Sequence, residues 1–245
     1  MVDDLLILPS ETRPAREAKR PQPVTDPLAV INLSAAGVTS ARRKALRHAL
    51  HAHLGLRGQD IIQTEAAGLV AALREAGQRR PQAVLIVGGD GSARTALETL
   101  TPLGVATAPL PGGTLNRLST ALYGRRPLAD LIQRVGKARP LWIPGGQVAG
   151  RRFFVASGYG PLMRLNAVRE SLRAGEPLCA WGRWRALAPT LFEEPLLVGP
   201  EQRPAACVLI GVGPLDAAFG LTPPIRPHGL EAASAQWRSL GQAFQ

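Results

Sequence analysis

The strongest constraint on the fold is an alternation of short apolar runs with amphipathic segments between residues 28 and 124. Apolar runs at 28–33, 60–64, 82–87 and 104–110 have the length of buried strands, and each precedes a segment with helical spacing. Strands that alternate with helices through short connections form parallel sheets covered on both faces. The sequence therefore predicts an α/β fold whose three-layer first domain carries every strand's carboxyl end on one edge.

The pattern changes beyond about residue 138, where short strand-like runs flank a helical stretch at about 161–192. This pattern of short strands around a helical stretch predicts a β-rich second domain with a helical insertion. Residues before the first strand are rich in proline and lack apolar periodicity, which is typical of a disordered segment. The predicted organisation is a disordered lead-in, an α/β domain and an incomplete β-rich domain, over residues 1–27, 28–136 and 137–245 respectively.

Two glycine-rich loops follow the third and fourth predicted strands, "GGDGS" at 88–92 and "LPGGTLN" at 110–116. A glycine turn that opens a helix is suited to phosphate, because free N–H groups and the positive helix end favour an anion. We expect Ser92 and Thr114 to cap the two helices. Both loops follow strands of one sheet, so we expect one crevice between them. The predicted nucleotide-binding loop positions are Gly88, Gly89, Asp90, Gly91, Ser92, Gly112, Gly113, Thr114 and Asn116.

Asp90 distinguishes the first loop from a simple phosphate cradle. A carboxylate repels phosphate oxygens unless Mg²⁺ lies between them, or unless it holds loop amides or a ribose hydroxyl. Asp90 therefore favours a nucleotide with a metal ion, and it is the candidate metal-side and catalytic residue. The alternative is a structural glycine turn with a capping aspartate.

The segments "VGGDGS" and "APLPGGTLNRLSTALYG" together resemble the catalytic domain of the diacylglycerol kinase family, in the bacterial lipid kinase branch related to sphingosine and ceramide kinases. The resemblance extends over roughly residues 28–231. It implies a two-domain kinase that binds ATP and Mg²⁺ in the inter-domain cleft and phosphorylates a lipid hydroxyl, on diacylglycerol or a similar lipid. It also implies nucleotide contacts at Thr64, which resembles part of a Thr-Glu pair, and at Asn32, which opens a turn with Leu33 in place of the usual proline.

The chain departs from that family near its C-terminus. The family has an Asp-Gly-Glu there that supplies a candidate general base, whereas this sequence reaches Gln245 without one. We therefore expect a truncated or degenerate member that binds ATP and Mg²⁺ but phosphorylates lipid poorly. Asp216 and Glu231 are the nearest substitutes for the base by position. The alternatives are an NAD-kinase-like enzyme and a non-catalytic nucleotide-binding remnant.

The net charge and the hydropathy of the chain limit the classes of partner that we expect. The net charge is +11, and nearly all basic residues are arginine, which indicates a general compositional bias. Aromatic residues are only 4% and form no basic cluster, so we expect no nucleic-acid partner. No apolar run is long enough to span a bilayer, and a cytoplasmic protein is expected.

The segment "LCAWGRWRALAPTLF" at 178–192 places Trp181 and Trp184 near one helical face with arginines beside them. Tryptophan and arginine at an apolar boundary suit a bilayer interface, which would let the protein contact the inner membrane face to collect a lipid. The alternative, which amphipathic stripes in general favour, is a helix packed against the second domain.

Overall fold

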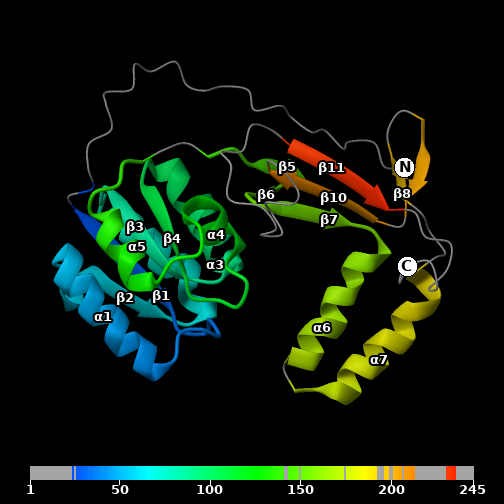
Figure 1. The fold of residues 1–245 in the computed structure, drawn as a ribbon, viewed down its shortest axis with the longest axis horizontal. Coiled ribbons are helices and arrows are strands. Elements are labelled where there is room, and N and C mark those ends of the chain that lie inside the picture. The colour runs from blue at the N-terminus through cyan, green and yellow to red at the C-terminus, as the bar shows by residue number, and fades with distance from the viewer. Residues whose placement is uncertain are drawn as a thin grey trace. The chain divides into compact units, whose positions relative to one another are not determined.

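Figure 1 shows the computed structural model of the chain. It describes residues 24, 26–140, 143–148, 150–173, 175–191, 196–198, 201–205, 207–212 and 230–235. The predicted lead-in therefore lies almost wholly outside the described residues. The chain divides into two compact units, Met1–Val155 with Asp216–His228, and Ala156–Leu215 with Gly229–Gln245.

The first unit contains a four-stranded sheet in the order β2-β1-β3-β4, in which every neighbouring pair is parallel. The strands are β1 (Pro27–Asn32), β2 (Ile61–Thr64), β3 (Ala83–Gly88) and β4 (Ala106–Pro111). All residues of β1 and β3 are buried. Continuous apolar runs of this kind are typical of strands covered on both faces.

Helices cover the two faces of this sheet, and side chains alternate between them along each strand (Figure 1). Ile31 and Val87 join the core formed with α1 and α5, whereas Val30 and Ile86 join the core formed with α2 and α3. The helices of this unit are α1 (Ser40–Leu54), α2 (Leu69–Gln78), α3 (Asp90–Leu100), α4 (Arg117–Tyr123) and α5 (Leu128–Val135), and the 3₁₀ turns are η1 (Gly58–Asp60), η2 (Ala66–Gly68) and η3 (Thr101–Leu103).

A short hairpin of β5 (Gly146–Val148) and β6 (Arg151–Phe153) also belongs to the first unit. Beyond it, Phe154 and Val155 pack against a small core of α3 and α4 residues. The division into units thus falls after Val155, whereas the sequence analysis places the domain boundary after residue 136. The difference arises because the chain returns to the first unit after its last helix.

The second unit is an antiparallel sheet in the order β11-β10-β7 with a helical insertion. The sequence predicted a single helical stretch here, but the structure has two helices. One ends just before Gly175 and the next begins just after it, and Gly175 has a φ of 75°. The elements are β7 (Ala156–Tyr159), η4 (Pro161–Arg164), α6 (Leu165–Arg173), α7 (Pro177–Leu187), η5 (Ala188–Leu191), β8 (Leu196–Val198), β9 (Arg203–Ala205), β10 (Cys207–Val212) and β11 (Leu230–Ala235). The predicted fold class, a parallel α/β sheet followed by a β-rich part with a helical insertion, is confirmed.

Helix α7 packs through only part of its predicted apolar stripe. Ala180 and Leu187 are buried and Trp184 is half-buried, but Leu178 is 86% exposed and Trp181 is 64% exposed. The packing interpretation is therefore wrong for Leu178 and Trp181. Within the described parts of the chain, no helix has the length and apolarity that a membrane span requires.

Candidate functional site

The candidate site lies at the edge of the parallel sheet where the four strands end (Figure 1). Asn32 is in register with Thr64, and Gly88 is in register with Pro111, so the loops that follow start side by side. Strand β1 lies between β2 and β3, at the point where the strand order reverses. Open α/β sheets bind their ligands at such a switch point.

The loops after β1, β3 and β4 are joined by main-chain hydrogen bonds. Gly37 N donates to Gly112 O at 2.9 Å, and Gly112 N donates to Gly88 O at 2.9 Å. A Cβ atom at Gly112 would lie 2.8 Å from Gly88 N, and one at Gly113 would lie 2.5 Å from Gly89 Cα. Neither Gly112 nor Gly113 has a positive φ. These glycines are needed because the loops approach each other closely, and a left-handed backbone is not the reason.

Gly91 differs from the other loop glycines. It lies in the first turn of α3 and is exposed. Apart from its two chain neighbours and the helix's own backbone, no atom of the described residues lies within 4 Å of the position that a Cβ would take. Its φ is not positive. An alanine therefore fits here and has a higher helix propensity than glycine. Neither packing nor backbone conformation accounts for a glycine at this position.

Ser92 does not cap α3, contrary to the sequence prediction. Gly89 is the N-cap residue and has no side chain that could accept a hydrogen bond, so the first-turn N–H groups of α3 receive no cap from it. Ser92 is instead buried, and its Oγ accepts a hydrogen bond from Asn32 Nδ2 at 2.9 Å. This bond fixes the end of β1 to the first turn of α3.

Asp90 links the two glycine loops. Its Oδ1 accepts a hydrogen bond from Leu118 N, in the first turn of α4, at 2.9 Å. The sequence analysis predicted that this carboxylate binds a metal ion, a backbone amide or a ribose hydroxyl. The structure shows that it binds a backbone amide. Among the described residues, no hydrogen bond reaches Oδ2, which leaves that oxygen available to a further ligand.

Asn116 holds the second glycine loop through its own side chain. Asn116 Oδ1 accepts from Gly113 N, and Asn116 Nδ2 donates to Gly113 O, both at 2.8 Å. Its backbone is left-handed, with a φ of 49°, a conformation that asparagine tolerates better than most residues. Helix α4 begins only at Arg117, so Thr114 is too far from it to be its cap. This correction follows from the extra turn that Asn116 closes.

The end of β2 carries a second polar cluster at the same edge. Ser34 Oγ donates to Glu65 Oε2 at 2.5 Å and accepts from Ala66 N at 2.9 Å. Thr64 Oγ1 donates to the neighbouring carbonyl of Glu65 at 3.1 Å. Thr64 was predicted from the sequence, but the pairing of Ser34 with Glu65 was not. The one feature of the sequence that indicates this pairing is that each residue follows the end of a strand.

Neither side chain of the two acidic residues predicted as a base belongs to the described part of the structure. Asp216 lies outside the described residues, and Glu231 is described only as a backbone position of β11, in register with Gly211. In the described part of the chain, no three His, Cys, Asp or Glu residues form a metal-binding group. A metal ion here would need ligands from a bound molecule in addition to Asp90.

Comparisons with known proteins agree with this geometry. The family described as "Diacylglycerol kinase catalytic domain" matches residues 27–143. A solved structure described as a diacylglycerol kinase from Bacillus anthracis str. Sterne has a TM-score of 0.61 and 19% identity, over 90% of this chain and 79% of that one. A comparison with curated proteins finds no match.

Two further structures from the same organism are each described as a putative diacylglycerol kinase. One has a TM-score of 0.54 and 19% identity over 78% of this chain. The other has a TM-score of 0.55 and 18% identity over 77% of this chain. The chain covers 65% and 66% of their respective lengths, which is less than two thirds of each. At these identities the likeness establishes a shared fold.

Proposed function

We propose that the protein is an ATP-dependent lipid kinase, because residues 27–143 match the family described as "Diacylglycerol kinase catalytic domain", which the sequence also resembles. In this reaction the acceptor's hydroxyl oxygen forms a bond to the γ-phosphorus of ATP. The bond from that phosphorus to the β,γ-bridging oxygen breaks, ADP leaves, and a base takes the hydroxyl proton. The acceptor is diacylglycerol or a lipid with a similar free hydroxyl.

The observation that carries the proposal is Gly91. The chain keeps a helix-destabilising residue where alanine fits the protein's own structure. A phosphate that approaches the first turn of α3 closely would explain this choice, because a methyl group would occupy its place. The uncapped N–H groups beside Gly89 supply the donors for such an anion.

The surrounding residues would hold this turn in position. The Asn32–Ser92 hydrogen bond fixes its orientation relative to β1, and the Asp90–Leu118 hydrogen bond fixes it relative to the second loop. Phosphoryl transfer depends mainly on positioning and on neutralising charge. A site built from linked backbone segments meets the first of these needs.

Asp90 fits a role beside a magnesium ion. Its Oδ1 is occupied by Leu118 N, which leaves Oδ2 as the ligand atom. Mg²⁺ commonly takes one or two carboxylates together with substrate phosphates, so a site with Asp90 as its one ligand among the described residues is compatible with it. When bound, the ion would offset the charge on the phosphates. The base stays a proposal, with Asp216 and Glu231 as its candidates.

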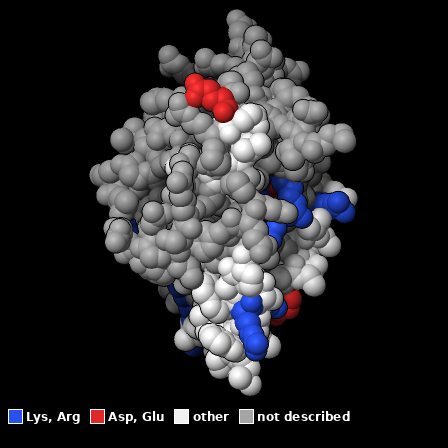
Figure 2. Space-filling model, turned by 90° about the vertical axis from the view of Figure 1, so that its right-hand side faces the viewer, with Lys and Arg blue, Asp and Glu red and all other residues white. Residues whose placement is uncertain are grey.

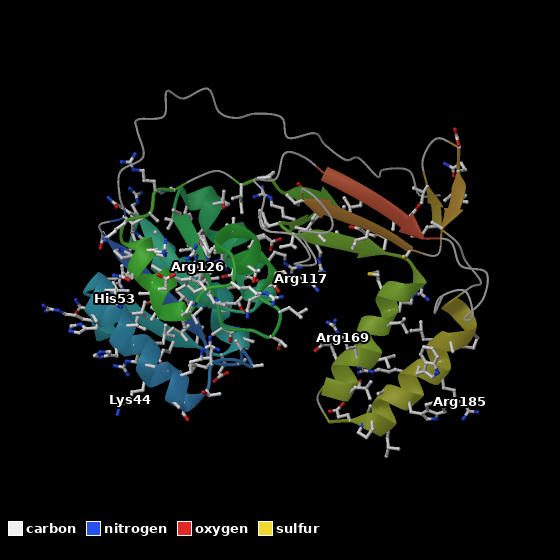
Figure 3. All side chains as sticks on the ribbon, in the orientation of Figure 1. Lys44, His53, Arg117, Arg126, Arg169 and Arg185 are labelled. Atoms are coloured by element: carbon white, nitrogen blue, oxygen red, sulfur yellow. The ribbon has the colours of Figure 1, made fainter. Side chains whose placement is uncertain are left out.

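The second unit supplies a surface for a lipid-bearing membrane. Leu178 and Trp181 on α7 are exposed, and Arg169 and Arg185 lie on the two helices of the same hairpin (Figure 3). Figure 2 shows the side of the molecule that lies on the right in Figure 1. In its lower part, basic side chains lie beside uncharged surface. Exposed tryptophan and leucine near arginine suit the interface of an anionic bilayer, so we place peripheral contact with the inner membrane face here.

The test is ATP binding by isothermal titration calorimetry with Mg²⁺, on the full chain and on Gly91→Ala. We expect Gly91→Ala to weaken ATP binding at least tenfold while its thermal midpoint stays unchanged or rises, because alanine favours the helix. Unchanged ATP binding in Gly91→Ala would contradict the proposed phosphate position. A wild-type protein that binds no ATP would reject the kinase proposal.

Asp90→Asn separates the two uses of the carboxylate. Asparagine keeps an oxygen that can accept from Leu118 N, so we expect the fold to be retained and the Mg²⁺-dependent part of ATP binding to be lost. Transfer of labelled phosphate from ATP to diacylglycerol, with NAD as the competing acceptor, then identifies the reaction. ATP binding without transfer to either acceptor would favour the nucleotide-binding remnant.

A further inference from the structure

The guanidinium of Arg42, in the first turn of α1, joins two loops at the candidate site. Arg42 Nη1 donates to Gly37 O at 3.1 Å, and Arg42 Nη2 donates to Pro111 O at 3.4 Å. Gly37 lies in the turn between β1 and α1, whereas Pro111 ends β4 and directly precedes Gly112. No ion pair joins Arg42 to a carboxylate in the described parts of the chain, so the guanidinium is directed at main-chain carbonyls.

These bonds hold the second glycine loop, residues 110–116, from the side of α1. On the side of β3, Gly112 N donates to Gly88 O at 2.9 Å. Asn116 closes the loop on itself, through both main-chain groups of Gly113. Neither of these contacts fixes the loop relative to α1. The bond from Arg42 to Pro111 O does so, together with the bond from Gly37 N to Gly112 O.

The turn after β1 is shaped to let these groups meet. A Cβ atom at Gly37 would lie 2.7 Å from Gly112 O and 3.0 Å from Arg42 Nη1. The φ of Gly37 is not positive, so its backbone conformation does not require glycine. Glycine is needed because the turn approaches both the loop carbonyl and the guanidinium. A missing side chain and an arginine thus serve the same junction.

The chemistry of the junction favours arginine over lysine. The planar guanidinium presents several donors in a fixed fork and can bind two carbonyls at once, whereas the ammonium of lysine is a compact charge on a flexible stem. Arg42 is exposed, so its side chain adds little to the stability of the core. The cap of α1 does not need this side chain either, because Thr39 Oγ1 accepts from the backbone N of Arg42.

We propose that Arg42 is a positioning residue, which holds the second glycine loop in place for the phosphates of a bound nucleotide. It acts through the fork of its guanidinium, which joins Gly37 O to Pro111 O, and its charge alone does not suffice. Backbone N–H groups bind an anion well only at the right distance and angle, so a small displacement of the loop weakens binding. The inference rests on the proposed nucleotide site at Gly91.

The first test is hydrogen–deuterium exchange on the full chain without nucleotide, measured on peptides that contain Gly112 and Gly113. We expect faster exchange there in Arg42→Met and in Arg42→Lys, because neither side chain can join the two carbonyls. Arg47→Met is the matched control. Arg47 is an exposed arginine of the same helix that donates to neither carbonyl, so this variant should exchange as wild type does. Unchanged exchange in both Arg42 variants would overturn the proposal.

The second test is the affinity for ATP with Mg²⁺, by calorimetry on the same proteins. We expect Arg42→Met to bind roughly tenfold more weakly, the effect of one hydrogen bond to a charged group, while its thermal midpoint stays close to that of wild type. Arg42→Lys should show most of this loss, and Arg47→Met should show none. Wild-type affinity in Arg42→Lys would overturn the role of the fork and assign the effect to charge.

The two tests distinguish this inference from the proposed function. A wild-type protein that binds no ATP would reject the nucleotide site and, with it, the effect of Arg42 on affinity. Faster exchange in the Arg42 variants would then still support its hold on the loop. ATP binding that is equal in wild type and Arg42→Met would overturn the role of Arg42 while leaving the nucleotide site intact.

Discussion

The parallel sheet of the first unit and the α6–α7 hairpin of the second unit differ in how far they bury their large apolar side chains. In the first unit, every residue of β1 and β3 is buried, and helices cover the sheet on both faces. In the second unit, the α6–α7 hairpin leaves Leu172, Leu178 and Trp181 exposed by 58%, 86% and 64%. The sheet uses its apolar residues for stability, whereas the hairpin presents some of its own apolar residues on the surface.

This difference indicates where function lies in each unit. The candidate chemistry of the first unit is in backbone groups and short polar side chains at the sheet edge, which a rigid core keeps in place. The candidate contact of the second unit is made by exposed side chains, whose replacement costs the fold little. The same kind of substitution should therefore damage different properties in the two units.

The largest expected effect is on stability, from Leu73→Ala in α2. Leu73 is fully buried, and truncation of such a residue typically costs roughly 2–5 kcal/mol of unfolding free energy. Leu178→Ala, at 86% exposure, should change it by less than about 0.5 kcal/mol. Urea unfolding followed by circular dichroism measures both. Similar losses in the two variants would show that Leu178 packs in solution and would remove the contrast.

The next effect is on membrane binding, from the double variant Leu178→Ser with Trp181→Ser. Transfer of these side chains into a bilayer interface would stabilise the bound state, so we expect their loss to weaken binding at least tenfold. Co-sedimentation with vesicles of phosphatidylglycerol and phosphatidylcholine measures it. Leu103→Ser, an exposed leucine of η3 in the first unit, is the control and should bind as wild type does. Retained binding by the double variant would assign any membrane contact to another surface.

The sequence was sufficient to predict the architecture of the first unit. Its four strands and four of its helices follow from apolar runs and helical spacing, because burial on both faces requires those patterns. The close placement of the two glycine loops also followed, since parallel strands end at one edge. Helix α5 was missed in the sequence analysis, although its apolar residues pack on the same face as α1.

Contacts between residues far apart in sequence could not be predicted in this way. The Asp90–Leu118 and Ser34–Glu65 bonds join residues 28 and 31 positions apart, and each depends on strand register and loop conformation. The cap of α3 was assigned to Ser92 because serine commonly caps helices, but Asn32 binds that hydroxyl. The exposure of Trp181 could not be predicted either, because an amphipathic stripe has the same spacing whether or not a partner covers it.

The smallest expected effect concerns Tyr123, at the end of α4, which packs against the α1–α5 core of the first unit. Burial raises the pKa of Tyr123 from 10.0 to about 12. The folded state then favours the neutral phenol, so the stabilisation is complete below pH 10 and is lost as the pH rises toward 12. At pH 11 the unfolding free energy should be lower by roughly 1 kcal/mol than at pH 9 on account of this group. Tyr123→Phe should lack that part of the decrease, measured by urea unfolding at the two pH values, whereas Tyr159→Phe in the second unit should retain it. An identical decrease in Tyr123→Phe and wild type would mean that the core does not enclose this phenol.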